Sequence, residues 1–179
     1  NQYLLDEVNI LSDTKEVNPS LFNSYVRQNP NAKWFNLVKV PMHIYCLSGQ
    51  DSTSSFNRFL KKLGDEPVIY DPFVTEKSKI EIEKAVRNMG YMRAKVHLNT
   101  ETKKNKLKVN YLIEAGKPYT VKHIAYNIDD MIINDYITKD SANSYLHEGM
   151  PFDVSVLDNE RYRITRLLQN NGYYKFNKD

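Results

Sequence analysis

The sequence contains one segment twice, with its motifs in the same order. The first copy consists of Gly64–Pro67, Asp71, a helical pattern and Asn88–Tyr91. The second consists of Glu148–Pro151, Asp153, a helical pattern and Asn170–Tyr173. When the two Gly-Tyr pairs are aligned, the apolar residues of the helical patterns coincide, with Ile82 over Ile164, Ala85 over Leu167 and Val86 over Leu168. A Gly-Tyr pair is also a common helix-to-strand junction, but agreement along the whole segment predicts two related modules.

The first copy predicts a strand, helices and then a hairpin. Leu4, Val8 and Ile10 share one face of a strand over 3–11. Asn18 is placed to cap a helix that starts at Pro19 and ends before Pro30. Helices over 56–63 and 75–89 follow, and alternating apolar residues then predict strands over 94–98 and 107–113 around a polar turn at 102–105.

The second copy predicts a strand over 119–126, helices over 130–137 and 154–171, and a strand over 173–176. Two strands follow Gly90, whereas the residues after Gly172 suffice for only one. We therefore expect residues 172–179 to collapse onto the 119–128 strand, to pair with a neighbouring molecule or to fray.

Glycine and proline at Gly116 and Pro118, between two strand patterns, predict a boundary between two modules. We expect residues 1–115 to form one module with an insertion around 31–55. Residues 117–179 would form a second module that lacks its last strand. In the insertion, apolar residues show no clear period: Trp34, Phe35, Leu37, Val38 and Val40. The chain starts at Asn1, and we expect it to be a piece excised from a longer protein.

Four segments, in this order, resemble the POTRA (polypeptide-transport-associated) domain. They are Gln28-Asn29-Pro30-Asn31, Gly64-Asp65-Glu66-Pro67-Val68, Ala115-Gly116-Lys117-Pro118-Tyr119, and Glu160–Ile164 running into Asn171–Phe176. Together they are similar to the periplasmic part of the BamA/TamA-type surface-antigen family, in a Bacteroidetes-like form. The resemblance implies an α+β fold of tandem β-α-α-β-β modules. Each module would be a small mixed three-stranded sheet covered on one face by two helices.

The resemblance also implies a function without catalysis. The chain would be a polypeptide-binding scaffold on the periplasmic face of the bacterial outer membrane, within an assembly or translocation factor that continues into a membrane β-barrel. Its partners would be unfolded outer-membrane or surface-protein clients and periplasmic assembly factors, with no nucleic acid, no small-molecule substrate and no cofactor. An alternative is a structural interaction module of a cell-division or adhesion protein.

Binding in such a module would use the edges of the sheet, where an extended polypeptide can add as a further strand. The resemblance points to the strand after the long helix of each copy. The candidate edge residues are Tyr91, Arg93, Lys95, His97, Tyr173, Tyr174 and Phe176, and the candidate module junction is Gly116, Pro118 and Tyr119. Arg93, Lys95 and His97 can equally serve as polar guards against aggregation.

Composition and spacing argue against other classes of protein. The 25 basic and 22 acidic residues give a net charge of only +3, unlike a nucleic-acid binder. One cysteine, Cys46, excludes an internal disulfide framework and a zinc site built from several cysteines. The four histidines, at 43, 97, 123 and 147, show no metal-ligand spacing. The cluster Lys103, Lys104, Lys106 and Lys108 suits a solvated hairpin tip, with acidic lipid headgroups or nucleic acid as the other interpretations.

Overall fold

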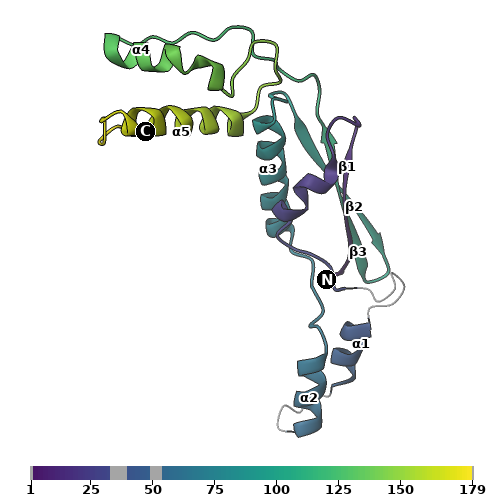
Figure 1. Ribbon diagram of the computed structural model, residues 1–179. Helices are drawn as coiled ribbons and strands as arrows, with labels where there is room; N and C mark the ends of the chain where they lie inside the picture. Colours follow the sequence, from purple (N-terminus) through teal and green to yellow (C-terminus); the bar gives the residue numbers. More distant parts are fainter. Residues whose placement is uncertain (1, 33–39, 49–53, 179) are drawn as a thin grey trace. The chain divides into compact units, whose positions relative to one another are not determined.

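The computed structural model of the chain describes residues 2–32, 40–48 and 54–178 (Figure 1). It divides into two compact units, of which the first comprises Asn1–Glu83 and Lys95–Glu114. The second comprises Lys84–Ala94 and Ala115–Asp179. Four apolar residues of the predicted insertion lie outside the described residues: Trp34, Phe35, Leu37 and Val38.

The first unit contains a mixed three-stranded sheet, as predicted. β1 (Leu4–Ser12) is parallel to β3 (Lys106–Glu114), and β2 (Lys95–Lys103) is antiparallel to it, so the order is β1-β3-β2. The apolar residues that alternate along β3 are all buried: Leu107, Val109, Tyr111 and Ile113. β3 is therefore the centre of the core.

A β-bulge in β1 changes which of its residues face that core. Leu5 is opposite Leu107, and after the register shift around Asp6, Val8 is opposite Val109. Neighbouring residues in a sheet point to the same side, so the bulge places the odd-numbered Leu5 and the even-numbered Val8 on one face. The prediction that Leu4 shares this face was wrong, and Leu5 is the buried residue. The alternation rule fails here because the bulge inserts one residue.

The helices of the first unit are η1 (Pro19–Tyr25), α1 (Val40–Leu47), α2 (Ser55–Leu63) and α3 (Pro72–Asn88), the last of which continues past Glu83 into the second unit. η1 begins as predicted, with the Asn18 side chain accepting from the Ser20 N–H. It is a 3₁₀-helix and ends earlier than predicted, because the Arg27 N–H donates to Ser78 Oγ of α3 at 3.0 Å. Both η1 and α3 contribute to the core with buried Phe22 and Ile82.

Two of the motifs that suggested the fold hydrogen-bond to each other. The Asn31 side chain donates to the Glu66 carbonyl at 2.8 Å and accepts from the Val68 N–H at 3.0 Å. Gln28 in the same way donates to the Ile69 carbonyl and accepts from the Asp71 N–H. These two amide side chains hold residues 66–71 beside the end of the segment that follows η1. Asn31 and Glu66, which lie before α1 and after α2, are therefore held together at one place.

The second unit is built on α4 (Met131–Lys139), η2 (Ser141–Asn143) and α5 (Val154–Asn170). Asp130 caps α4 by accepting from the N–H groups of Ile132 and Ile133. Ile137 and Leu168 are buried in this unit. Gly90 is required at the end of α3, because its φ is +95° and a Cβ there would lie 2.4 Å from the Phe152 carbonyl oxygen.

The strands predicted for the second module do not form. Within the described residues of this unit, extended pairing is limited to a bridge between Thr120 and Pro151, with the Val121 N–H donating to the Met150 carbonyl at 2.9 Å. The segment 173–176 makes a turn in which the Phe176 N–H donates to the Tyr173 carbonyl. A strand is stable only beside a hydrogen-bonded neighbour, and apolar alternation alone does not supply one. The C-terminal segment instead folds back on α5, where Gln169 donates to the Phe176 carbonyl.

The two long helices begin and end at aligned positions of the repeat, and each has 17 residues. Asp71 and Asp153 both cap their helices. Ser78 and Glu160 also align, and both are buried. Each accepts from the main-chain N–H two residues after a 3₁₀-helix, Arg27 after η1 for Ser78 and Tyr145 after η2 for Glu160. The two copies therefore share a way of attaching a 3₁₀-helix to the long helix.

We expect Leu168→Ala to lower the free energy of unfolding by about 2–5 kcal/mol, because the Leu168 side chain is fully buried and its removal leaves a cavity. A urea titration followed by the circular dichroism of the helices measures the change. Tyr174→Ala, at a side chain that is 82% exposed, is the control and should change stability little. A loss below about 1 kcal/mol at Leu168 would contradict the packing described for α5.

Candidate polypeptide-binding edge

The outer edge of β2 offers main-chain groups for a further strand. Lys103 pairs with Lys106 across a two-residue turn, so these two residues form the closing hydrogen-bonded pair of the hairpin. Hydrogen-bonded pairs then alternate with non-bonded ones, which turns the N–H and C=O groups of every second residue away from β3. Val96 belongs to the set of residues whose main-chain groups point away from β3, since its N–H donates outward to Glu83 of α3 at 3.0 Å. The outward-facing residues beyond it are Leu98, Thr100 and Thr102.

The opposite edge of the sheet is partly covered. The Leu5 N–H of β1 donates to the Val68 carbonyl, and the Tyr70 N–H donates to the Tyr3 carbonyl, both at 2.8 Å. Among the residues that the structure describes, no strand pairs with the outer edge of β2. β2 is therefore the edge with more room for another chain.

One apolar residue of this edge is only half-buried, namely Leu98. A chain lying along β2 could place an apolar side chain against it.

The structure separates the predicted edge residues. Lys95 and His97 lie in β2 with exposed side chains, and His97 Nε2 is 3.2 Å from Glu114 Oε2 on β3. Tyr91 and Arg93 lie in the turn before β2, where Tyr91 is buried and Arg93 is exposed. They belong to no strand, because the helix end at Gly90 is followed by a turn in which the Ala94 N–H donates to the Tyr91 carbonyl.

Tyr173, Tyr174 and Phe176 lie in the C-terminal turn described above, so they form no edge strand. At the predicted junction, Gly116 has a φ of +71°, a conformation that favours glycine. Pro118 is exposed, and the Tyr119 N–H donates to the Gly90 carbonyl at 2.9 Å.

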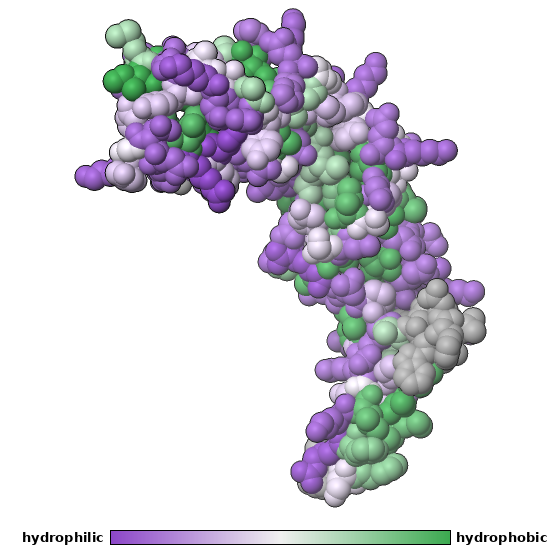
Figure 2. Space-filling model, viewed as in Figure 1, coloured by the Kyte–Doolittle hydropathy of each residue, from purple (hydrophilic) through white to green (hydrophobic). Residues whose placement is uncertain are grey.

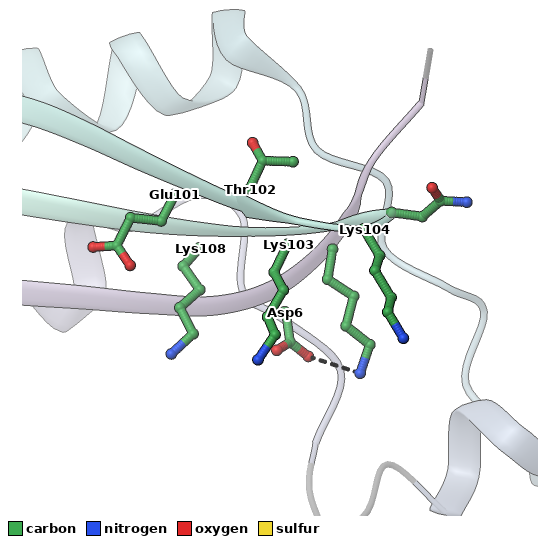
Figure 3. Close-up of a pocket in the computed structure, with 8 residues that line it drawn as sticks. Asp6, Glu101, Thr102, Lys103, Lys104 and Lys108 are labelled. Atoms are coloured by element: carbon green, nitrogen blue, oxygen red, sulfur yellow. Dashed lines mark ion pairs between the residues drawn. The ribbon is translucent and has the colours of Figure 1, made fainter.

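The lysine cluster surrounds a shallow depression at the tip of the β2–β3 hairpin (Figure 3). Lys106 lies 3.8 Å from Asp6, and Lys108 lies 2.8 Å from Glu7. The hydrogen bond and charge of Glu7 raise the pKa of Lys108. Lys103 and Lys104 extend to the same side of the hairpin as Asp6. The cluster is thus partly neutralised by β1, in agreement with a solvated tip.

One polar cluster was missed by the sequence reasoning. Glu160 of α5 is 3% exposed and accepts hydrogen bonds from Arg163, Ser144, Tyr126 and the Tyr145 N–H. Arg163 also pairs with Asp140 at the end of α4. Burial raises the pKa of Glu160, but the bonds from Arg163, Tyr145 and Ser144 outweigh it and lower the pKa to about 2. The only signal in the sequence is the i, i+3 spacing of Glu160 and Arg163, which is equally common on solvated helix faces.

Within the described residues, no group of three or more His, Cys, Asp or Glu side chains is arranged to hold a metal ion. The Cys46 thiol is exposed. Among the helices of the described ranges, none combines the length and the apolar character needed to cross a membrane.

The first unit has the element order β-α-α-β-β, counting η1 and α3, and a mixed sheet of order β1-β3-β2. This topology confirms the POTRA-like α+β fold that the sequence predicted for it. No family model matches the sequence, and no curated protein matches it.

Among solved structures, the chain is similar to BamA from Haemophilus ducreyi lacking POTRA domains 1–3, with a TM-score of 0.43 and 16% identity over 97% of this chain and 25% of that one. It is also similar to Haemophilus influenzae BamA POTRA3–5, with a TM-score of 0.33 and 11% identity over 98% of this chain and 88% of that one. A third similar structure is POTRA1–2 of the periplasmic domain of Omp85 from Anabaena, with a TM-score of 0.38 and 11% identity over 98% of this chain and 83% of that one. The chain thus spans a quarter of the first of these structures, and the Bacteroidetes-like form stays a prediction.

We expect Glu160→Gln to lower the free energy of unfolding by roughly 3 kcal/mol at neutral pH, because it leaves Arg163 without its buried carboxylate partner. The folded pKa lies below the unfolded value of about 4.3, so the carboxylate stabilises the fold above that value. This contribution is lost as the pH falls from about 4.3 towards 2, and the two proteins should then differ little.

Urea titrations over a pH series, with amide hydrogen exchange in α5, measure this difference. Glu148→Gln is the control, since Glu148 pairs with His123 at an exposed position. A difference between wild type and Glu160→Gln that stays constant from pH 7 to about pH 2 would show that the carboxylate charge is not responsible.

Proposed function

We propose that the chain is a non-catalytic polypeptide-binding scaffold of an outer-membrane protein assembly or translocation factor. It binds extended segments of other proteins as an additional strand on the outer edge of β2. In this proposal the chain lies on the periplasmic face of the outer membrane. Its partners are unfolded outer-membrane or surface proteins and periplasmic assembly factors, and residues 1–115 and 117–179 are two modules of one kind.

The observation that carries the proposal is the outward direction of the main-chain groups of Leu98, Thr100 and Thr102. Each of them offers one N–H and one C=O to a neighbouring chain. Main-chain hydrogen bonds depend little on the side chains of the bound segment, so one edge can accept many clients. The Val96 N–H already donates to Glu83, so it is not offered to a bound chain, and the site ends there near the beginning of β2.

The neighbouring side chains favour bound segments in which apolar and polar residues alternate. In a strand added to β2, every second side chain would point to the face covered by α3. There it would lie beside the half-buried Leu98. The side chains in between would lie on the face that carries Lys95 and His97, where polar residues are compatible with water and with these two groups.

Thr100→Pro tests this use of the edge. Proline removes the outward N–H of residue 100 and brings a ring into the path of the bound chain, and an edge position tolerates it because no ladder bond to β3 is lost. We expect the affinity for a peptide of about ten residues with alternating apolar and polar side chains to fall about tenfold or more. Isothermal titration calorimetry measures the affinity, and NMR shift changes along β2 locate the peptide.

Thr100→Val is the matched control, because it keeps the N–H and changes only the side chain. It should bind the peptide within about twofold of the wild type. Equal peptide binding by folded Thr100→Pro and Thr100→Val would exclude strand addition at this edge, and shift changes outside β2 and α3 would move the site elsewhere.

A further inference from the structure

The helical hairpin α1–α2 presents apolar side chains to solvent. Phe56, Phe59 and Leu63 follow one another along one face of α2 at intervals of three and four residues. They are 66%, 56% and 55% exposed, and Leu47 at the end of α1 is 75% exposed. The space-filling view shows apolar side chains gathered at this hairpin, beside a hydrophilic strip (Figure 2). Exposed apolar side chains that are grouped in this way are typical of an interaction surface.

The rest of the charged surface of α2 is basic. Arg58 and Lys61 lie roughly 100–160° around the helix from Phe56 and Phe59, and Lys62 lies about 60° from Phe59, at the border of the apolar stripe. Residues 40–48 and 54–64 contain no Asp or Glu, so nothing acidic within these described residues of the hairpin neutralises the three cations. α2 is thus an amphipathic helix with two aromatic residues on its apolar face and only positive charge on its polar face.

Close contact between the ends of the two helices holds the hairpin together. A Cβ at Gly64 would lie 2.4 Å from the Tyr45 nitrogen and 2.7 Å from the Pro41 carbonyl oxygen, so only glycine allows the backbones to approach in this way. The Asp65 N–H donates to the same Pro41 carbonyl at 3.1 Å. Met42 is buried in this hairpin while the stripe of α2 stays exposed. The exposed stripe is therefore not used to join the two helices.

The hairpin is attached at the end of the sheet that carries the lysine cluster. Residues 66–68, which follow α2, bond to Asn31 and to Leu5 of β1. At the same end of β1 the Leu4 N–H donates to the Asn105 carbonyl in the turn between Lys104 and Lys106. Lys103 and Lys104 therefore lie near the base of the insertion, which adds positive charge at this end of the unit.

We infer that α1–α2 is a membrane-surface element that lies on a bilayer containing anionic phospholipids. The aromatic and leucine side chains enter the boundary between headgroups and acyl chains, and Arg58, Lys61 and Lys62 stay at the level of the phosphates. Amphipathic helices with aromatic and leucine residues on one face and basic residues on the other bind in this way. The surface potential of anionic lipids attracts each of these cations.

The charge distribution favours a bilayer over a second copy of this chain. A symmetric dimer through the stripe would bring two hairpins of equal positive charge together, and like charges repel. A bilayer with anionic headgroups instead offers negative charge beside an apolar layer, and α2 has the complementary groups in the same relative arrangement. No acidic protein groove is needed to match them.

Flotation with lipid vesicles tests the inference on the 179-residue chain. We expect it to bind vesicles of phosphatidylcholine with about 30% phosphatidylglycerol, and to bind pure phosphatidylcholine about tenfold less. Phe56→Ser with Phe59→Ser removes the apolar anchor, and Arg58→Gln, Lys61→Gln and Lys62→Gln together remove the charge. Each set should lower the partition coefficient about tenfold.

Two matched controls lie in the second unit. Met131→Ser with Ile132→Ser removes apolar side chains of α4 that are 85% and 61% exposed. Replacing the exposed Lys117, Lys122 and Lys175 by glutamine removes the same charge as in α2. Both controls should bind vesicles like the wild type, and circular dichroism should show that all variants are folded.

Three results would overturn the inference. They are equal binding to both kinds of vesicle, hairpin variants that bind like the wild type, and controls that lose binding as the hairpin variants do. Sedimentation velocity tests whether a second copy of this chain occupies the surface instead. A wild-type dimer that Phe56→Ser with Phe59→Ser dissociates, without a change in vesicle binding, would assign the stripe to a second copy.

Discussion

Among the strands of the described residues, β3 alone has hydrogen-bonded strands on both of its sides, and this constraint determines how the first unit is used. Its side chains from Leu107 to Ile113 form the centre of the core, so β1 and β2 must both be edges. Val68–Tyr70 covers the beginning of β1, and Glu83 occupies one end of β2. What remains is the outward-facing main chain of Leu98, Thr100 and Thr102 on β2. The location of the proposed binding edge thus follows from the strand order.

Apart from α1, which lies in a segment without a clear apolar period, the helices could be predicted from the sequence because their signals are local. Asp71, Gly90, Asp130 and Gly172 are caps or helix ends that act within a few residues, and the predicted helices agree with the structure to within about one turn. The bulge at Asp6 could not be predicted, because it depends on the register between β1 and β3. The strands predicted at 119–126 and 173–176 failed for the same reason. Their apolar alternation says nothing about whether a neighbouring strand is available.

The repeat is preserved in geometry more than in chemistry. At one aligned position, a neutral serine in α3 and a buried carboxylate in α5 both accept from a main-chain N–H that follows a 3₁₀-helix, η1 and η2 respectively. The serine needs no counter-ion, whereas Glu160 brings Arg163 and Asp140 with it. An alignment by residue type would therefore overlook this correspondence. The same difference makes only the second unit depend on a buried ion pair at this position.

Asn31 has a consequence for how such a chain can change over evolutionary time. By bonding to both Glu66 and Val68, it ties the residues before α1 to the residues after α2. Duplication, shortening or replacement of the intervening residues would leave the core connected as before. A lineage could then acquire or discard a whole helical hairpin in one genetic event, while Gln28, Asn31 and residues 66–71 remain under selection for folding alone.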